Sequence, residues 1–288
     1  MAGSKLHSIM LPVRGDGKGD NVLAHAAVLA RKFGAHVRVV HCHPAAQDMM
    51  PFGVVVPSFL RQQIESAVKS SASSTEDQLR EEFRGLIAGM GLKEQERPEP
   101  GVATANFCEY VGKQVDAVSH HGRLADLICV AQPDHEQNLG INTLKSALFS
   151  SGRPVLVCPD RDTPPATIGR HVAVGWNGSL EASRAVRFSA PFFDSAEEVT
   201  ILVSGNNPHA ATGEELQDYL AHRGVASQIR RFETRGIAGH ALLSNCEQIG
   251  ADLLVMGAYH ESYGRETVFG GNSQVVVDET KIPVVMAH

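Results

Sequence analysis

The chain has 288 residues, of which 43% are hydrophobic and 20% charged, and its formal net charge is −6 at pH 7. This length favours two domains, and the acidic balance argues against a general affinity for nucleic acid, which needs a basic surface. The five cysteines form no CxxC pair, which argues against a disulfide framework or a four-cysteine zinc site and favours a reducing cytoplasm.

Short apolar runs alternate with helical patterns along the first half of the chain. IMLPV at 9–13 has the length of a strand, and the following apolar residues recur at helical spacing up to Gly34, a residue that suits a helix end. The predicted elements are strands at 9–13, 36–42, 102–111, 126–132 and 154–159, and helices at 21–34, 58–91, 115–125 and 142–152.

The second half shows the same alternation, with continuous Val, Ile and Leu runs in its central strands. Its predicted elements are strands at 172–176, 199–205, 227–234, 252–258 and 283–287, and helices at 181–193, 213–224, 239–251 and 273–280. Buried strands separated by helices predict a parallel, doubly wound α/β sheet with helices on both faces.

The two halves are copies of one another. ADLICVAQPD at 125–134 matches ADLLVMGAYH at 251–260, and RPVLVCP near the end of the first half matches IPVVMAH at the end of the second. Because the order of elements is the same, we interpret the chain as a tandem duplication. We expect domains at 1–162 and 168–288, joined by the Pro- and Thr-rich segment 160–169.

Two loops of the second half follow strands whose carboxyl ends would border a ligand crevice. They are GWNGS at 175–179 and GAYHESYGRETVFGGNS at 257–273. Their glycines would let the backbone approach a ligand closely, and the amides of a helix beginning after Gly270 would favour an anion. Ser273 would add a hydroxyl donor, and Arg265 would pair with a phosphate as a bidentate fork.

The alternation of strand and helix in both copies, each ending in a pair such as ADLLVMG and IPVVMAH, resembles a tandem universal stress protein, and the resemblance covers nearly the whole chain. It implies two five-stranded, Rossmann-like domains related to adenine-nucleotide alpha hydrolases. It also implies that the last strands of the two halves pair, as an internal pseudo-dimer, with further association into a homodimer left open.

Members of this family that bind ATP carry G-x2-G-x9-G-[ST] after the fourth strand and an Asp after the first strand. Here Gly257 and Gly270 match the first and third glycines, whereas His260 replaces the second glycine and Gly271 replaces the Ser or Thr. Asn177 takes the place of the Asp. The resemblance therefore implies an adenine nucleotide, ATP with Mg²⁺, in the second half. The residues expected at the nucleotide are Trp176, Asn177, Val203, Met256, Gly257, His260, Arg265, Gly270, Gly271, Asn272 and Ser273.

Trp176 has two interpretations, since it would either flank a base or pack against its strand.

The first half departs much further from the family motif. Gln132 and Pro133 follow its fourth strand, Gly140 stands alone, and the RGDGKGD loop at 14–20 lacks the GK[ST] ending of a Walker A motif. We therefore expect no nucleotide in the first half.

Other clusters give weaker signals. The HCHP segment at 41–44 invites a zinc interpretation, but His41 and His43 fall on one side of a strand and Cys42 on the other, without a third ligand. Cys129 and Cys158 lie in Val-rich strands and are expected in the core. No nucleophile elbow, HExxH motif or Ser/His/Asp order is present, so we assign no catalytic residue.

Three functions remain open. The first is a cytoplasmic stress-response protein that binds an adenine nucleotide in its second half, with at most slow ATP hydrolysis. The second is a module of the same fold that binds no nucleotide and acts through protein contacts. The third is an enzyme acting on another phosphate-bearing substrate, ranked last because no paired carboxylates or base lie near the loops. No apolar run reaches the roughly 18 residues of a membrane span, so we expect no membrane as partner. The acidic balance of the chain leads us to expect no nucleic acid as partner either.

Overall fold

The computed structural model describes residues 5–13, 19–43, 78–137, 139–161, 163–205, 208–234, 236–258 and 271–288. In the first half the strands are β1 (Ser8–Val13), β2 (His36–His43), β3 (Lys93–Glu94), β4 (Thr104–Val111), β5 (Leu127–Ala131) and β6 (Val155–Cys158). In the second half they are β7 (His171–Trp176), β8 (Glu198–Ser204), β9 (Gln228–Phe232), β10 (Leu253–Gly257) and β11 (Val284–Ala287).

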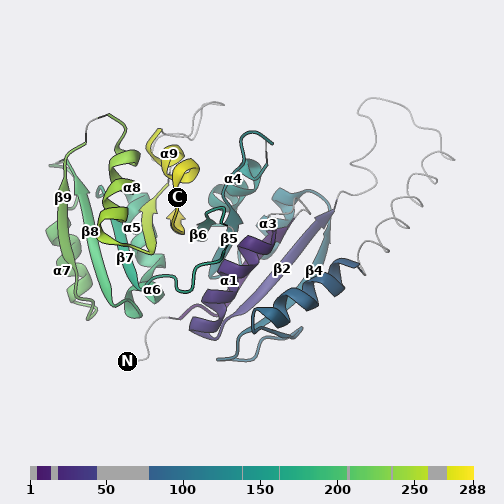
Figure 1. Ribbon diagram of the computed structural model, residues 1–288. Helices are drawn as coiled ribbons and strands as arrows, with labels where there is room; N and C mark the ends of the chain where they lie inside the picture. Colours follow the sequence, from purple (N-terminus) through teal and green to yellow (C-terminus); the bar gives the residue numbers. More distant parts are fainter. Residues whose placement is uncertain are drawn as a thin grey trace.

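All of these strands form one sheet, in the order β3-β4-β2-β1-β5-β6-β11-β10-β7-β8-β9 (Figure 1). Neighbours within each half are parallel, whereas β6 and β11 pair antiparallel and join the halves, with Leu156 opposite Val285. The alternation of apolar runs and helices thus gave the correct sheet type, because parallel strands need a helical crossover between them. β3 was not predicted, since two exposed residues carry no apolar pattern.

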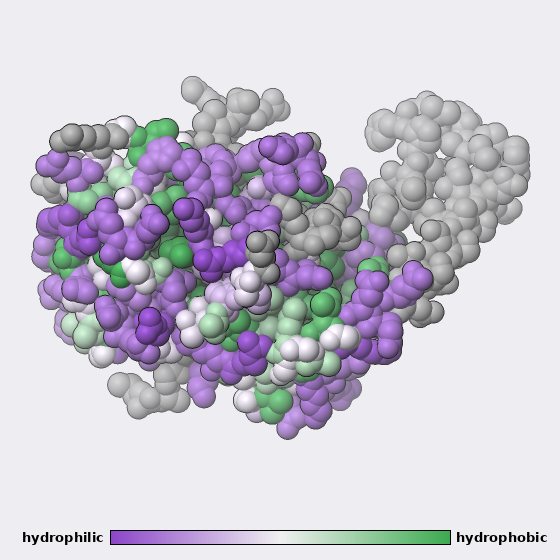
Figure 2. Space-filling view, viewed as in Figure 1, coloured by the Kyte–Doolittle hydropathy of each residue, from purple (hydrophilic) through white to green (hydrophobic). Residues whose placement is uncertain are grey.

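The helices are α1 (Gly19–Phe33), α3 (Gln114–Gly122), α4 (Ile141–Ser150), α5 (Leu180–Phe188), α6 (Ala190–Asp194), α7 (Gly213–Ala221), α8 (Ala238–Ile249) and α9 (Gly271–Glu279), together with a helix at 78–89. One core cluster lies between the sheet and α1, the 78–89 helix, α5, α6 and α7. A second cluster lies on the opposite face, under α3, α4, α8 and α9. The predicted doubly wound arrangement is therefore confirmed. The face of the molecule shown in Figure 2 is mostly hydrophilic, with smaller hydrophobic patches.

One prediction of a helix was wrong in its extent. The segment 181–193 was expected to form one helix, but α5 ends at Phe188 and a separate short helix, α6, begins at Ala190. Pro191 lies in the first turn of α6, where it has no amide to continue the hydrogen bonds of α5. The predicted helix at 58–91 is described only from residue 78 onward.

The repeated Ala-Asp-Leu sequence has a structural explanation. In the first half the Asp126 carboxylate accepts hydrogen bonds from the His7 and Ser8 amides, at 2.8 and 3.0 Å. In the second half the Asp252 carboxylate accepts hydrogen bonds from the Arg170 and His171 amides, at 3.1 and 2.9 Å. Each Asp thus accepts hydrogen bonds from the backbone amides at the beginning of the first strand of its own half. An apolar residue in its place would leave these amides without a hydrogen-bond partner.

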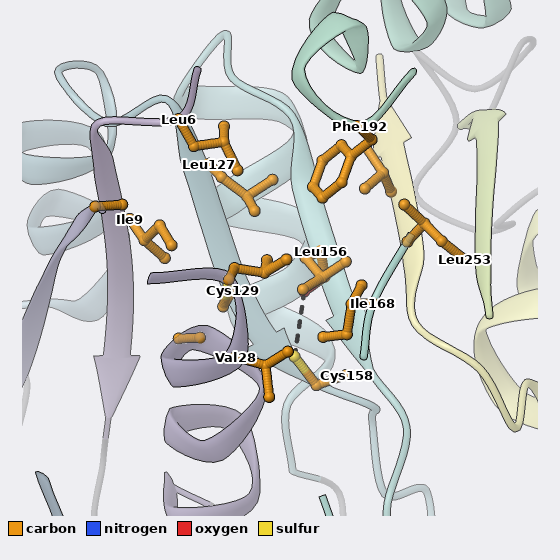
Figure 3. Close-up of a cluster of buried hydrophobic side chains, with 14 of the residues drawn as sticks. Leu6, Ile9, Val28, Leu127, Cys129, Leu156, Cys158, Ile168, Phe192 and Leu253 are labelled. Carbon is orange, nitrogen blue, oxygen red and sulfur yellow. Dashed lines mark hydrogen bonds between the residues drawn. The ribbon is translucent and has the colours of Figure 1, made fainter. Parts of the chain in front are cut away.

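The two halves also share a core. Figure 3 shows Phe192 and Leu253 of the second half close to Leu156 and to Ile168 of the linker. The Phe192 ring meets Phe33 of α1 edge-on, with ring centroids 5.8 Å apart. Lys32, also on α1, donates hydrogen bonds from its Nζ to the carbonyls of Ile168 and Gly169, at 3.0 and 3.1 Å. The end of the linker, Ile168 and Gly169, is therefore packed between the halves, whereas most of its other described residues are exposed.

Cysteine usage agrees with the sequence analysis. All five cysteines are free thiols, and Cys129 and Cys158 are fully buried in the core. Burial also raises the pKa of the Cys246 thiol to about 12, which keeps it protonated and unreactive at neutral pH. Among the described residues, no helix is both long enough and apolar enough to cross a bilayer.

Candidate functional site

A cavity of about 580 Å³ opens at the carboxyl ends of β7 and β8. It is lined by residues 176–180, 203–205 and 209–213 and by Arg231 of β9. In the second half the strands run in the order β9-β8-β7-β10-β11, so the strand order reverses between β7 and β10, and the cavity lies beside this reversal. Open α/β sheets bind their ligands at such a switch point.

Trp176, Asn177 and Val203 are the sequence-predicted residues that border this cavity. Trp176 ends β7 and is 8% exposed. Its indole Nε1 donates hydrogen bonds to the carbonyls of Ala211 and Thr212, at 2.9 and 3.1 Å. The indole thus packs against the segment before α7, a contact that neither interpretation from the sequence included. Its only polar atom is satisfied by the protein, so its ring is what remains to contact a ligand.

The loop after β7 is folded by its own side chains. Asn177 Oδ1 accepts a hydrogen bond from the Ser179 amide at 3.1 Å, and the Ser179 hydroxyl accepts one from the Ala182 amide at 3.1 Å, as the N-cap of α5. Gly178 has a φ of +71°, and a Cβ there would lie 2.6 Å from the Ala210 Cβ. The loop after β7 and the segment before α7 therefore close one wall of the cavity.

Helix α7 begins at the same wall with a capping box. The Thr212 hydroxyl accepts a hydrogen bond from the Glu215 amide at 3.2 Å, and the Glu215 carboxylate accepts one from the Thr212 amide at 2.7 Å. We predict that Thr212→Ala lowers the free energy of unfolding by about 1 kcal/mol, because it leaves an amide of the first turn unpaired. Urea denaturation checks this, with Thr212→Ser as the variant that should retain stability. Equal losses for Ala and Ser would show that the hydroxyl cap is not the cause.

The sequence analysis missed the cation that this cavity contains. Arg231 projects from β9 to the cavity and pairs with Glu214 in the first turn of α7. The hydrogen bond from Arg231 lowers the pKa of the Glu214 carboxyl, which keeps the pair ionised at neutral pH. Side chains alternate between the two faces of a strand, so the sequence places the neighbouring residues Arg230 and Arg231 of β9 on opposite faces. It does not indicate which of the two faces borders the cavity.

Met256 and Gly257 do not border the cavity. Met256 is 7% exposed and belongs to the core beneath α8 and α9. Gly257 ends β10 under the first turn of α5, where a Cβ would lie 2.5 Å from the Ala182 nitrogen and 2.8 Å from the Glu181 carbonyl carbon. Because these are backbone atoms that cannot rotate away, the packing of α5 by itself requires a glycine at this position.

Gly271, Asn272 and Ser273 form the start of α9, on the other side of the switch point. Asn272 Oδ1 accepts a hydrogen bond from the Gly239 amide at 3.3 Å, so this side chain holds the start of α8. Ser273 is 7% exposed, and Gly271 is exposed with open space around it. His260, Arg265 and Gly270 lie outside the described residues.

At the same edge of the sheet, the first half has a smaller cavity of about 300 Å³, lined mainly by Leu, Val and Phe side chains of β1, β2, α1 and the 78–89 helix. Beside it, His41 and His43 both contact the Glu109 carboxylate of β4, at 3.5 and 3.4 Å. The described residues contain no group of three or more His, Cys, Asp or Glu side chains able to hold a metal ion.

Comparisons with known proteins relate the second half to a known family. Residues 169–288 match the sequence model of the universal stress protein family. The whole chain resembles the structure of a universal stress protein from Archaeoglobus fulgidus DSM 4304, with a TM-score of 0.69, 13% identity, and coverage of 98% of this chain and 96% of that chain. No curated protein matches the sequence.

Two structures from Pseudomonas aeruginosa are similar over the same extent. A putative universal stress protein from strain UCBPP-PA14 has a TM-score of 0.54 and 15% identity, with coverage of 98% of this chain and 93% of that chain. A functionally unknown protein from strain PAO1 has a TM-score of 0.54 and 16% identity, with coverage of 98% and 92%. At these identities the likeness shows the fold, which is that of two tandem α/β domains.

Proposed function

Because residues 169–288 carry the sequence of the universal stress protein family and the whole chain has the fold of full-length relatives, we propose that this protein binds an adenine nucleotide in its second half. The observation that carries the proposal is the cavity of about 580 Å³ beside the switch point, a volume in the usual range for small-molecule sites. We place the base and ribose in this cavity, and the phosphates towards the start of α9.

The lining fits such a ligand chemically. The ring of Trp176 and the side chain of Val203 offer apolar surface for a base, and Ser204 offers a hydroxyl for a ribose. Arg231 supplies a positive charge at the rim, although it shares that charge with Glu214. Mg²⁺ would arrive bound to the phosphates, as it does at many nucleotide sites, so no group of protein carboxylates is needed to hold it.

We propose a regulatory role in stress response, in the cytoplasm, rather than rapid catalysis. The two halves would act as an internal pseudo-dimer, and the pairing of β6 with β11 and the shared core around Phe192 support this arrangement. Sedimentation of the purified protein would then give the mass of one 30.9 kDa chain or, if homodimers form, twice that mass.

The test is equilibrium dialysis with ATP and Mg²⁺. We predict saturable binding by the unmodified protein and an affinity at least about tenfold lower for Val203→Phe, a loss of about 1.4 kcal/mol, because the larger ring fills the cavity. The matched control is His41→Phe, which changes the residue at the corresponding position of β2 in the first half and should leave the affinity unchanged. Absence of binding by the unmodified protein at millimolar ATP would instead favour a module that acts through protein contacts.

A further inference from the structure

The loop after β5 in the first half has the position of a nucleotide loop but not its sequence. Its Gln132 donates hydrogen bonds from Nε2 to the carbonyls of Val277 and Asp278, both at 2.8 Å, and more weakly to that of Thr280 at 3.4 Å. These carbonyls lie at the end of α9 in the second half, where a helix leaves its last acceptors without partners. Gln132 thus caps a helix of the other domain.

The end of α9 carries acidic side chains that contact histidines. Asp278 and Glu279 place two carboxylates in the last turn of α9, which contains no Lys, Arg or His. Negative charge is unfavourable at this end of a helix, because the helix dipole is negative there. Histidines contact both carboxylates, since His135 Nε2 of the first-half loop lies 2.7 Å from Asp278 Oδ1, while His240 of α8 contacts Glu279 at 3.0 Å.

The first-half loop is closed into a fixed shape. Asp134 and Leu139 exchange backbone hydrogen bonds of 3.0 and 2.9 Å, and the Asp134 carboxylate accepts a further one from the Gln137 amide at 3.0 Å. The side-chain oxygen of Gln132 also has a partner within the first half. Gln132 Oε1 accepts a hydrogen bond from the Asp160 amide at 3.1 Å. Gln132 is therefore held in place by its own domain before it reaches α9.

Among the described residues, the contact has no equivalent at the matching position of the second half. Ala258 is the counterpart of Gln132 in the second half, since the amide of each residue donates to the last strand of its own half, at 2.8 and 2.9 Å. The bond that both halves share at this position is made by the backbone amide. The methyl side chain of Ala258 cannot donate a hydrogen bond, so it cannot cap the end of α4 as Gln132 caps the end of α9. The Nε2 donors of Gln132 thus serve α9, while its Oε1 and its backbone amide bond within its own half.

Helix α9 runs from this contact to the position proposed for the nucleotide phosphates. It has nine residues and is about 13 Å long, and its first turn contains Asn272 and Ser273. Its start is held by the Asn272 contact to Gly239, and its end by Gln132 and His135. Because a helix of this length moves as a rigid rod, a shift at its end also displaces its first amides.

We propose that Gln132, supported by His135, is a positioning residue for α9, through which the first half sets the nucleotide affinity of the second. This inference rests on the proposed function. It gives the first half a role that does not require a nucleotide of its own, and it explains why the loop after β5 carries AQPDH in place of a glycine-rich sequence.

Three variants test the proposal. Gln132→Met keeps the volume of the side chain but removes its donors, whereas Gln132→Lys keeps donors aimed at the end of α9. Glu136→Gln changes an exposed residue of the same loop and serves as the control. The measurements are ATP affinity with Mg²⁺ and hydrogen exchange at the amides of α9, with the amides of α8 as the internal reference.

We expect Gln132→Met to weaken ATP binding about fivefold and to speed exchange in α9 but not in α8, while Lys restores both and Glu136→Gln changes neither. Unchanged exchange in α9, equal acceleration in α8, or wild-type affinity despite faster exchange would each overturn the proposal. If the unmodified protein binds no ATP, the proposed function fails together with the effect on affinity. The exchange measurement then still decides whether Gln132 holds α9.

Discussion

Phe192→Ala lowers the free energy of unfolding by about 4 kcal/mol, the largest effect we expect from a single substitution. Phe192 is 1% exposed and lies where α6, the linker and α1 of the first half meet (Figure 3). Removing its ring leaves a cavity that the surrounding backbone cannot close, because the continuous sheet fixes the strands beneath it. Chemical denaturation followed by circular dichroism measures the loss.

The control for this variant is Leu124→Ala, which truncates a leucine that is 81% exposed and should change the stability by less than about 0.5 kcal/mol. Since Phe192 contacts both halves, Phe192→Ala should shift one cooperative transition of the whole chain. Two separated transitions, with only the second half destabilised, would contradict the account of a shared core.

Gly257→Ala lowers the free energy of unfolding by about 2 kcal/mol, because the added Cβ would lie 2.5 Å from the Ala182 nitrogen and the start of α5 must move away. Thermal unfolding measures this. The matched control is Gly271→Ala at the start of α9, where nothing lies within 4 Å of the added atom and the stability should stay within about 0.5 kcal/mol.

The same pair of variants separates packing from ligand contact. If Gly257→Ala were as stable as the unmodified protein but lost ATP affinity, Gly257 would contact the nucleotide and our structural explanation would be wrong. The stretch GAYHESYGRETVFGG therefore begins with a glycine that the helix packing already explains, and a glycine at position 257 is by itself no evidence for phosphate binding.

Much of the fold follows from local sequence patterns. The strands and helices of both halves, and the parallel sheet that they form, come from apolar periodicity and from the repeat of Ala-Asp-Leu, whose Asp126 and Asp252 perform the same task in each copy. The break between α5 and α6 was missed because apolar residues continue at helical spacing across it, although Pro191 marks the position.

The candidate site was less accessible to sequence reasoning. Trp176 and Asn177 lie in a loop that the strand-end rule selected, and Val203 was expected from the family resemblance; the structure brings all three to one cavity. Arg231 and the segment before α7 were missed, because their approach to the cavity depends on how β9 and α7 pack. The contact of Gln132 with α9 was also missed, since residues 132 and 278 are brought together only by the pairing of β6 with β11.

The most direct test of a nucleotide in the second half uses the single tryptophan of the chain. Trp176 lines the cavity, and no other tryptophan contributes emission, so its fluorescence reports on this site alone. We predict a saturable change in Trp176 emission on titration with ATP and Mg²⁺, after correction for absorbance with free N-acetyltryptophanamide, and the same change shifted to at least about tenfold higher ATP in Val203→Phe. ATP binding measured by dialysis without any change in Trp176 emission would place the nucleotide elsewhere and contradict the account.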